Sequence, residues 1–159
     1  MKRFVTSILL TFLCCSVQGN EVSTKVLSFS DLEKIGYKET DKLKYDGQRC
    51  DQYEIDFPAT KRYQSIKSLK PITEGQNIYY RFTLIKEKFK NEENAIKRLE
   101  QFKQTNKIKS DSWYSKSCSL KQGFRRGVNV YFVATDAGMF KDQIADVVSK
   151  LKRLLILSE

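Results

Sequence analysis

The sequence predicts an α+β fold: a single domain with an antiparallel β-sheet, two long amphipathic helices packed on one face of that sheet, and one disulfide. Three observations lead to this prediction. The chain has 159 residues, of which 40% are hydrophobic and 30% charged, as in one globular domain. Helix and strand patterns follow one another in the order α-β-β-α-β-β-α, with hairpin-sized connections between paired strands. No Gly/Ser-rich or Pro-rich linker divides residues 20–159.

The N-terminal residues have the layout of a cleavable secretory signal. Lys2 and Arg3 precede a mostly apolar stretch at 4–15, and small or modest residues follow. The alternative is a transmembrane anchor, which needs about 20 apolar residues. Hydroxyl side chains interrupt this stretch, which favours the signal. We therefore expect a signal peptide over 1–19 and one exported α+β domain over 20–159, periplasmic if the source is bacterial and otherwise secreted.

Two cysteines, Cys50 and Cys118, lie outside the predicted signal. An even pair in an exported protein predicts a disulfide, and two buried free thiols are the alternative. The bond would close a loop of roughly seventy residues, which the chain-entropy model values at about 4 kcal/mol.

The first half of the domain contains one short helix and two strand patterns. A capping box that begins at Ser30, with a glycine beyond it, predicts a helix at 31–35. Apolar and polar residues alternate over 53–57, which predicts a half-buried strand. Residues 60–70 carry apolar groups at spacing three and fit either a loose helix or an irregular crossover. Residues 77–86 are rich in β-formers on both faces, which predicts a central strand.

The second half contains two helices and a hairpin. Asn91 caps a predicted helix at 92–104. Its inward stripe consists of Ala95, Ile96, Leu99 and Phe102. Two strands, 113–121 and 127–135, are joined through a turn at 122–127 that holds two glycines. The last element is a helix with an apolar face made of Phe140, Ile144, Val147, Val148, Leu151, Leu154 and Leu155. The charged residues on its other face are Lys141, Asp142, Asp146, Lys150 and Arg153.

A faint internal repeat has an offset of 51 residues. It aligns Tyr80, Phe89 and Lys90 with Tyr131, Phe140 and Lys141. The alternative is that any two strand-then-helix units look alike.

Several classes of chemistry are excluded or unsupported. The chain has no histidine, which excludes Ser-His-Asp and Cys-His catalysis and removes the commonest ligand of catalytic zinc. There is no dense carboxylate loop for calcium, no phosphate loop and no dinucleotide motif. We therefore expect no metal and no cofactor.

One pair of carboxylates keeps a hydrolase open as an alternative. Glu54 and Asp56 share a strand face with Gln52, and two nearby acids are the minimum for glycoside hydrolysis. The polar face of any strand produces such pairs without a function. With both long helices on one side of the sheet, the opposite side would be at least partly exposed to water and available as a working surface.

The charge distribution is more informative. Without residues 1–19 the chain has 27 basic and 19 acidic residues, a net charge of +8. Residues 97–126 alone hold nine basic residues against two acidic ones. Trp113 and Tyr114 lie within this stretch, next to Cys118. Arginines and aromatics on a pinned loop have the composition of a protein-binding hot spot. The predicted binding residues are Trp113, Tyr114, Lys116, Lys121, Arg125 and Arg126. The alternative is a solvated lysine face with Trp113 buried in the core.

Together these observations predict a non-enzymatic exported binding protein. Its partner would be a protein with an acidic surface, and the chain would act as an inhibitor, an immunity factor or an assembly accessory. The first alternative is a binder of anionic envelope polymer or lipid headgroups, and the second is a small hydrolase that uses Glu54 and Asp56. We expect no nucleic-acid partner, because an exported protein meets little nucleic acid. We also expect no integral membrane segment after processing.

Overall fold

The computed structural model describes residues 26–41, 57–110, 120–135 and 137–157. In chain order the elements are α1 (Phe29–Lys34), β1 (Tyr37–Glu39), β2 (Ala59–Ser68), β3 (Arg81–Phe89), α3 (Glu92–Ser110), β4 (Leu120–Arg126), β5 (Asn129–Thr135), the short 3₁₀ helix η3 (Gly138–Phe140) and α4 (Lys141–Leu157). The strands form one antiparallel sheet in the order β1-β2-β3-β5-β4. The α+β class, the antiparallel sheet and the central position of the strand predicted at 77–86 are therefore confirmed, with that strand shifted to Arg81–Phe89.

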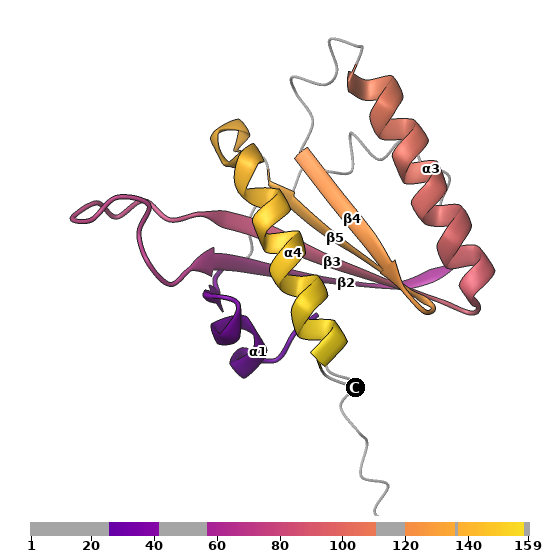
Figure 1. Cartoon of the computed structure of the whole chain (residues 1–159), viewed down its shortest axis with the longest axis horizontal. Helices are drawn as coiled ribbons and strands as arrows, with labels where there is room; N and C mark the ends of the chain where they lie inside the picture. The colour runs from indigo at the N-terminus through magenta and orange to yellow at the C-terminus, as the bar shows by residue number, and fades with distance from the viewer. Residues whose placement is uncertain (1–25, 42–56, 111–119, 136, 158–159) are drawn as a thin grey trace, which may run out of the picture.

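The two long helices lie on opposite faces of the sheet. Leu84 is paired with Val133 and Ile85 with Phe132, so alternate rungs of β3 and β5 point to opposite sides. Leu84 and Val133 belong to a core that α1 and α4 cover, whereas Ile85 and Phe132 belong to a second core that α3 covers. We call these sides the α4 face and the α3 face; in Figure 1, α4 crosses in front of the strands. The prediction that both long helices pack on one face is wrong.

The apolar character of both sides of β3 explains this arrangement. Phe82 and Leu84 face one core and Ile85 and Phe89 the other, and all four side chains are at most 3% exposed. A strand that is apolar on both sides must be covered on both sides, since either exposed row would lose its hydrophobic burial.

Helix α1 begins two residues earlier than predicted. The N-cap is Ser28, whose Oγ accepts a hydrogen bond from the Asp31 backbone N–H at 3.1 Å. The Ser28 hydroxyl also donates to the Asp31 carboxylate at 2.7 Å, and this bond and Lys34 hold the pKa of Asp31 below its ordinary value. Gly36 follows the C-cap with φ +84°, a conformation that favours glycine, so the predicted stop is confirmed.

Residues 59–68 form β2, so the prediction of a helix or crossover at 60–70 is wrong. Strand β2 pairs with β3 from Ala59 to Lys67. Buried and exposed residues do not alternate along β2, because three consecutive residues, Gln64, Ser65 and Ile66, are all buried. Gln64 is buried because its amide pairs with the backbone of Leu27, accepting at 2.9 Å and donating at 3.2 Å. The predicted strand at 53–57 falls almost wholly outside the described residues, and Phe57 itself precedes β2.

Helix α3 is longer than predicted, and its buried face is turned slightly. Asn91 caps it as expected, because its Oδ1 accepts from the Asn94 backbone N–H at 2.9 Å. Ala95 and Phe102 are buried, but Ile96 is 40% exposed. Ile96 was predicted to face inward, but the buried side chain in this part of the helix is Arg98, which is 3% exposed.

A hairpin of β4 and β5 is confirmed, but β4 begins at Leu120, and residues 113–119 of the first strand predicted at 113–121 lie outside the described residues. The turn is shorter than the predicted 122–127 and keeps only the second of its two glycines. Strand β4 continues to Arg126, and the turn consists of Gly127 and Val128. Gly127 has φ +54° while no non-glycine residue described has a positive φ, as in a type II′ turn. Gly123 lies inside β4, where a Cβ would come within 2.4 Å of the Phe132 ring.

The terminal helix is confirmed, and its phase is as predicted. Ile144, Val147, Val148 and Leu151 are buried against the α4 face, while Leu154 and Leu155 pack at its margin. The topology repeats a hairpin followed by a helix, first as β2-β3-α3 and then as β4-β5-α4. The residues aligned at offset 51 are not equivalent, because Phe89 ends a strand and Phe140 lies in η3. No helix in the described ranges is long and apolar enough to cross a membrane.

Candidate binding surfaces

The predicted binding residues separate into those that the structure describes and those that it does not. The described members all lie on β4: Lys121, Arg125 and Arg126. The others lie outside the described residues, as do the predicted disulfide and the carboxylate pair: Trp113, Tyr114, Lys116, Cys50, Cys118, Glu54 and Asp56.

The three described members do not form one surface. Lys121 and Arg125 lie on the α3 face, and Arg126 lies on the α4 face. The Lys121 ammonium lies over the Phe132 ring at 5.0 Å and the Phe102 ring at 5.4 Å, so it packs beneath α3. Arg125 Nη1 donates to Glu92 Oε2 at 3.1 Å and to the Gly127 carbonyl at 3.0 Å. Arg125 is therefore held within the fold rather than extended from a turn tip.

Other cations of the 97–126 stretch are also paired internally. Lys97 forms an ion pair with Glu93 at 2.7 Å, one turn away on α3. Arg98 Nε donates to Glu87 Oε2 at 2.8 Å, and both side chains are about 5% exposed. A buried pair of this kind fixes geometry more than it adds stability. The partners at positions 87, 92 and 93 precede residue 97, so a charge count within 97–126 misses them.

A different group of cations gathers on the α4 face. Arg62 is the register partner of Lys86, and Lys88 lies two residues further along β3 on the same side. We call Arg62, Lys86 and Lys88 the cationic cluster. Burial, and next the charges of Arg62 and Lys88, lower the pKa of Lys86 below its ordinary value. The Lys86 ammonium lies over the Tyr131 ring at 5.5 Å.

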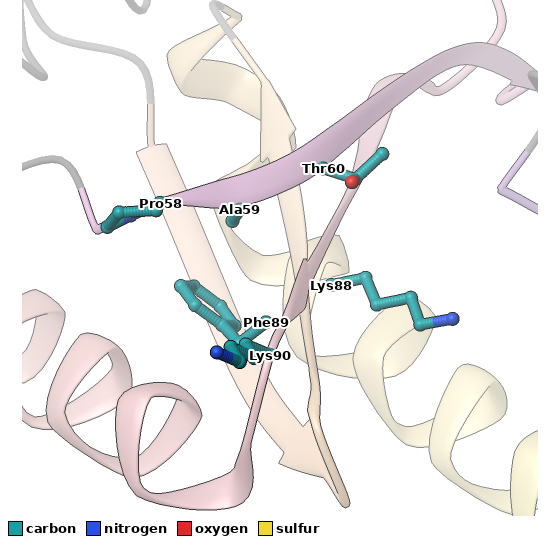
Figure 2. A pocket seen from close by; sticks show the side chains of 6 residues that line it. All are labelled: Pro58, Ala59, Thr60, Lys88, Phe89 and Lys90. Atoms are coloured by element: carbon teal, nitrogen blue, oxygen red, sulfur yellow. The ribbon is translucent and has the colours of Figure 1, made fainter.

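An open hollow of about 370 Å³ adjoins the cluster where β2 begins and β3 ends. Figure 2 shows Lys88 and Phe89 pointing to opposite sides of β3. Lys88 extends on the α4 side, while Phe89 belongs to the core beneath α3. The residues that line the hollow are Pro58, Ala59, Thr60, Lys88, Phe89 and Lys90.

The connection between β2 and β3 forms a second surface. Residues 69–80 extend away from the sheet as a narrow loop (Figure 1), which we call the arm. Its two sides are joined by the Ile72 N–H, which donates to the Ile78 carbonyl at 2.7 Å, and Gly75 lies at the tip with φ +80°. At its base, Tyr80 packs edge-on against Phe140 at 5.4 Å.

The arm exposes apolar side chains. Leu69, Ile72 and Ile78 are 41%, 36% and 48% exposed. The sequence offered a signal for this hairpin, since Thr73-Glu74-Gly75-Gln76-Asn77 is a turn-forming run between two isoleucines. The arm is not among the predicted elements because residues 60–70, which include most of β2 and the start of the arm, do not alternate in polarity.

Comparisons with known proteins add no relative: no family model, curated protein or solved structure matches this chain. Within the described ranges, no group of three or more Cys, Asp or Glu side chains could hold a metal ion.

Proposed function

We propose that this chain is a non-enzymatic exported protein that binds a protein partner through the arm. The observation that carries the proposal is the exposure of Leu69, Ile72 and Ile78 on a hydrogen-bonded projection that stands clear of the sheet. Exposed apolar side chains gathered on one feature are typical of interaction sites. A projecting hairpin fits a concave surface, so the complementary feature is an apolar groove on the partner.

The backbone of the arm is restrained before binding. The Ile72–Ile78 bond holds its two sides, and the Ser68 N–H donates to the Tyr80 carbonyl at 2.9 Å at the base. A segment that is already ordered loses less conformational entropy when it binds, so more of the apolar burial contributes to affinity.

The charges beside the arm favour an acidic partner. Lys67, Lys70 and Arg81 lie at its base, and Glu74 is the single acid between residues 67 and 81. None of these three cations forms an ion pair with a described carboxylate. Complementary charges at the rim of an interface steer association and set specificity.

Three other parts of the proposal rest on the sequence. Residues 1–19 support export, and the Cys50/Cys118 pair supports a disulfide in an oxidising compartment. Trp113, Tyr114 and Lys116 are proposed as a second contact with the same partner. Binding rather than catalysis is favoured because the chain has no histidine, the commonest general base.

The test compares two matched pairs of substitutions. The arm variant is Ile72→Ala with Ile78→Ala, and the control is Ile96→Ala with Ile156→Ala, which truncates two exposed isoleucines on the helices. Each tagged chain is expressed in its native cells, and the captured proteins are quantified by mass spectrometry. The affinity for a stoichiometric captured protein is then measured by calorimetry.

We expect the control to keep the partner and the arm variant to lose affinity by about tenfold or more, as at interface hot spots. Both variants should unfold within a few degrees of the wild type, because exposed truncations cost little stability. Equal affinity of both variants would exclude the arm, and the absence of any stoichiometric partner would exclude protein binding.

A further inference from the structure

The β2–β3 register holds three cations together on the α4 face. Arg62 lies directly opposite Lys86, a position at which Cβ atoms are about 5 Å apart. Lys88 follows two residues along the same strand face, a rise of about 7 Å. The spacing is fixed by the backbone pairing of the central strand rather than by a flexible loop.

These three cations differ from others in the fold. Lys34, Lys97, Arg98, Arg125 and Lys150 each form an ion pair with a carboxylate. By contrast, Arg62, Lys86 and Lys88 form no ion pair with any carboxylate in the described ranges. Helix α4 brings a further positive charge to this side of the sheet, because Lys152 lies over Phe124, whose ring stacks on Tyr131 beside Lys86.

This arrangement is unfavourable in the free protein. Like charges directly opposite one another on a sheet repel. Burial is the larger cause of the lowered pKa of Lys86, and the positive charges of Arg62 and Lys88 lower it further. An anion that contacts all three side chains would remove the repulsion, so the free energy of binding would include that relief.

We propose that the cationic cluster is a binding site for closely spaced phosphate groups. A single phosphate carries a charge of about −1.5 to −2 near neutral pH, which is less than the three positive charges of the cluster. Two or more adjacent phosphates match it. The guanidinium of Arg62 can bind one phosphate through two parallel N–H bonds, and the lysines act as point charges on the neighbouring oxygens.

The hollow beside the cluster leaves space for a ligand that extends beyond the three cations. Lys88 belongs to both features, because it extends on the α4 side and also lines the hollow. A chain of phosphates that begins at Arg62 and Lys86 would therefore reach Lys88 at the edge of the hollow. The arm lies at the other end of β2 and β3, so this site and the proposed protein contact are separate.

The test uses two triple variants that remove the same charge. The cluster variant is Arg62→Gln, Lys86→Gln and Lys88→Gln. The control is Lys103→Gln, Lys141→Gln and Arg153→Gln, three exposed residues on α3 and α4. Inorganic tripolyphosphate is titrated by calorimetry at low salt, and vesicles of phosphatidylglycerol in phosphatidylcholine are tested by co-sedimentation. Thermal unfolding of each protein is recorded with and without tripolyphosphate.

We expect the cluster variant to lose about tenfold or more in affinity for at least one probe, and the control to lose no more than about twofold. Tripolyphosphate should raise the unfolding temperature of the wild type and the control but not that of the cluster variant. Binding to tripolyphosphate identifies a soluble polyphosphate ligand, and binding to vesicles alone identifies lipid headgroups. Equal losses in both variants, or no binding by the wild type to either probe, would overturn the proposal.

Discussion

At the scale of single residues, Gly123 shows how a glycine can be required by packing rather than by a turn. Its position in β4 leaves no room for a side chain, because a Cβ would lie 2.4 Å from one carbon of the Phe132 ring and 2.9 Å from the Tyr131 carbonyl. Phe132 is 1% exposed and sits in the core beneath α3, so it cannot move away freely.

We therefore predict that Gly123→Ala lowers the free energy of unfolding by about 1–3 kcal/mol, the usual cost of overpacking. Gly138→Ala is the matched control, since nothing lies within 4 Å of the added Cβ and φ is not positive there. Urea unfolding of both variants measures the difference. Similar stability of the two would show that the Phe132 ring moves aside at little cost.

The same scale explains why the binding residues were only partly predictable. Lys121 lies in a strand, as the hairpin pattern indicated, whereas Arg125 lies in β4 and not in the predicted turn. Their partners, Phe102 and Glu92, come from α3. A count of charged residues along a stretch of sequence detects an excess of positive charge. Whether each cation has an ion-pair partner depends on which helix packs on which strand. The cationic cluster was missed for the same reason, because Arg62 and Lys86 are adjacent only through the β2–β3 register.

At the scale of elements, periodicity predicted helices better than strands. The face of α4 was correct because one run of aliphatic residues repeats over four turns and faces a single core. The strand β2 was missed because its burial depends on distant groups, such as the Leu27 backbone that pairs with Gln64. Local alternation carries no information about such a partner.

We predict that Leu151→Ala lowers the free energy of unfolding by about 2–5 kcal/mol, the range for a buried leucine that leaves a cavity. Leu151 is 1% exposed in the core that α4 covers. Its neighbour Lys150 pairs with Asp146 at 2.8 Å on the outer face, and such a pair contributes about 0.3–0.5 kcal/mol. Lys150→Ala should therefore change stability little. Thermal or chemical unfolding compares the two, and equal losses would contradict the helix phase.

At the scale of the whole molecule, the sheet is a middle layer between helices, with α1 and α4 on one face and α3 on the other. The sequence contained the signal for this, since both sides of the 77–86 stretch are apolar. The order of helices and strands alone does not determine which face of the sheet each helix covers. For this reason the prediction that both long helices pack on one face is wrong. On the α4 face of β3, the buried apolar residues Phe82 and Leu84 are followed by Lys86 and Lys88, which belong to the cationic cluster.

Burial between the layers also has a consequence for the pH dependence of the whole fold. Tyr37 is 4% exposed in the core of the α4 face, and burial, followed by the negative charge of Asp146, raises its pKa to about 12. An unfolded tyrosine has a pKa of about 10, so the folded state holds the phenolic proton more tightly. The stabilising contribution is therefore complete below about pH 10 and is lost as the pH rises towards 12.

We predict that the free energy of unfolding of the wild type falls more steeply between pH 10 and 12 than that of Tyr37→Phe, which has no phenolic proton to lose. Lysine side chains also titrate in this range, but they do so in both proteins, so the difference between the two curves isolates Tyr37. Urea unfolding at a series of pH values from 7 to 11.5 provides the measurement, with each protein referred to its own stability at pH 7. Parallel curves would contradict the prediction, since they would mean that the Tyr37 hydroxyl ionises as readily in the folded protein as in the unfolded chain.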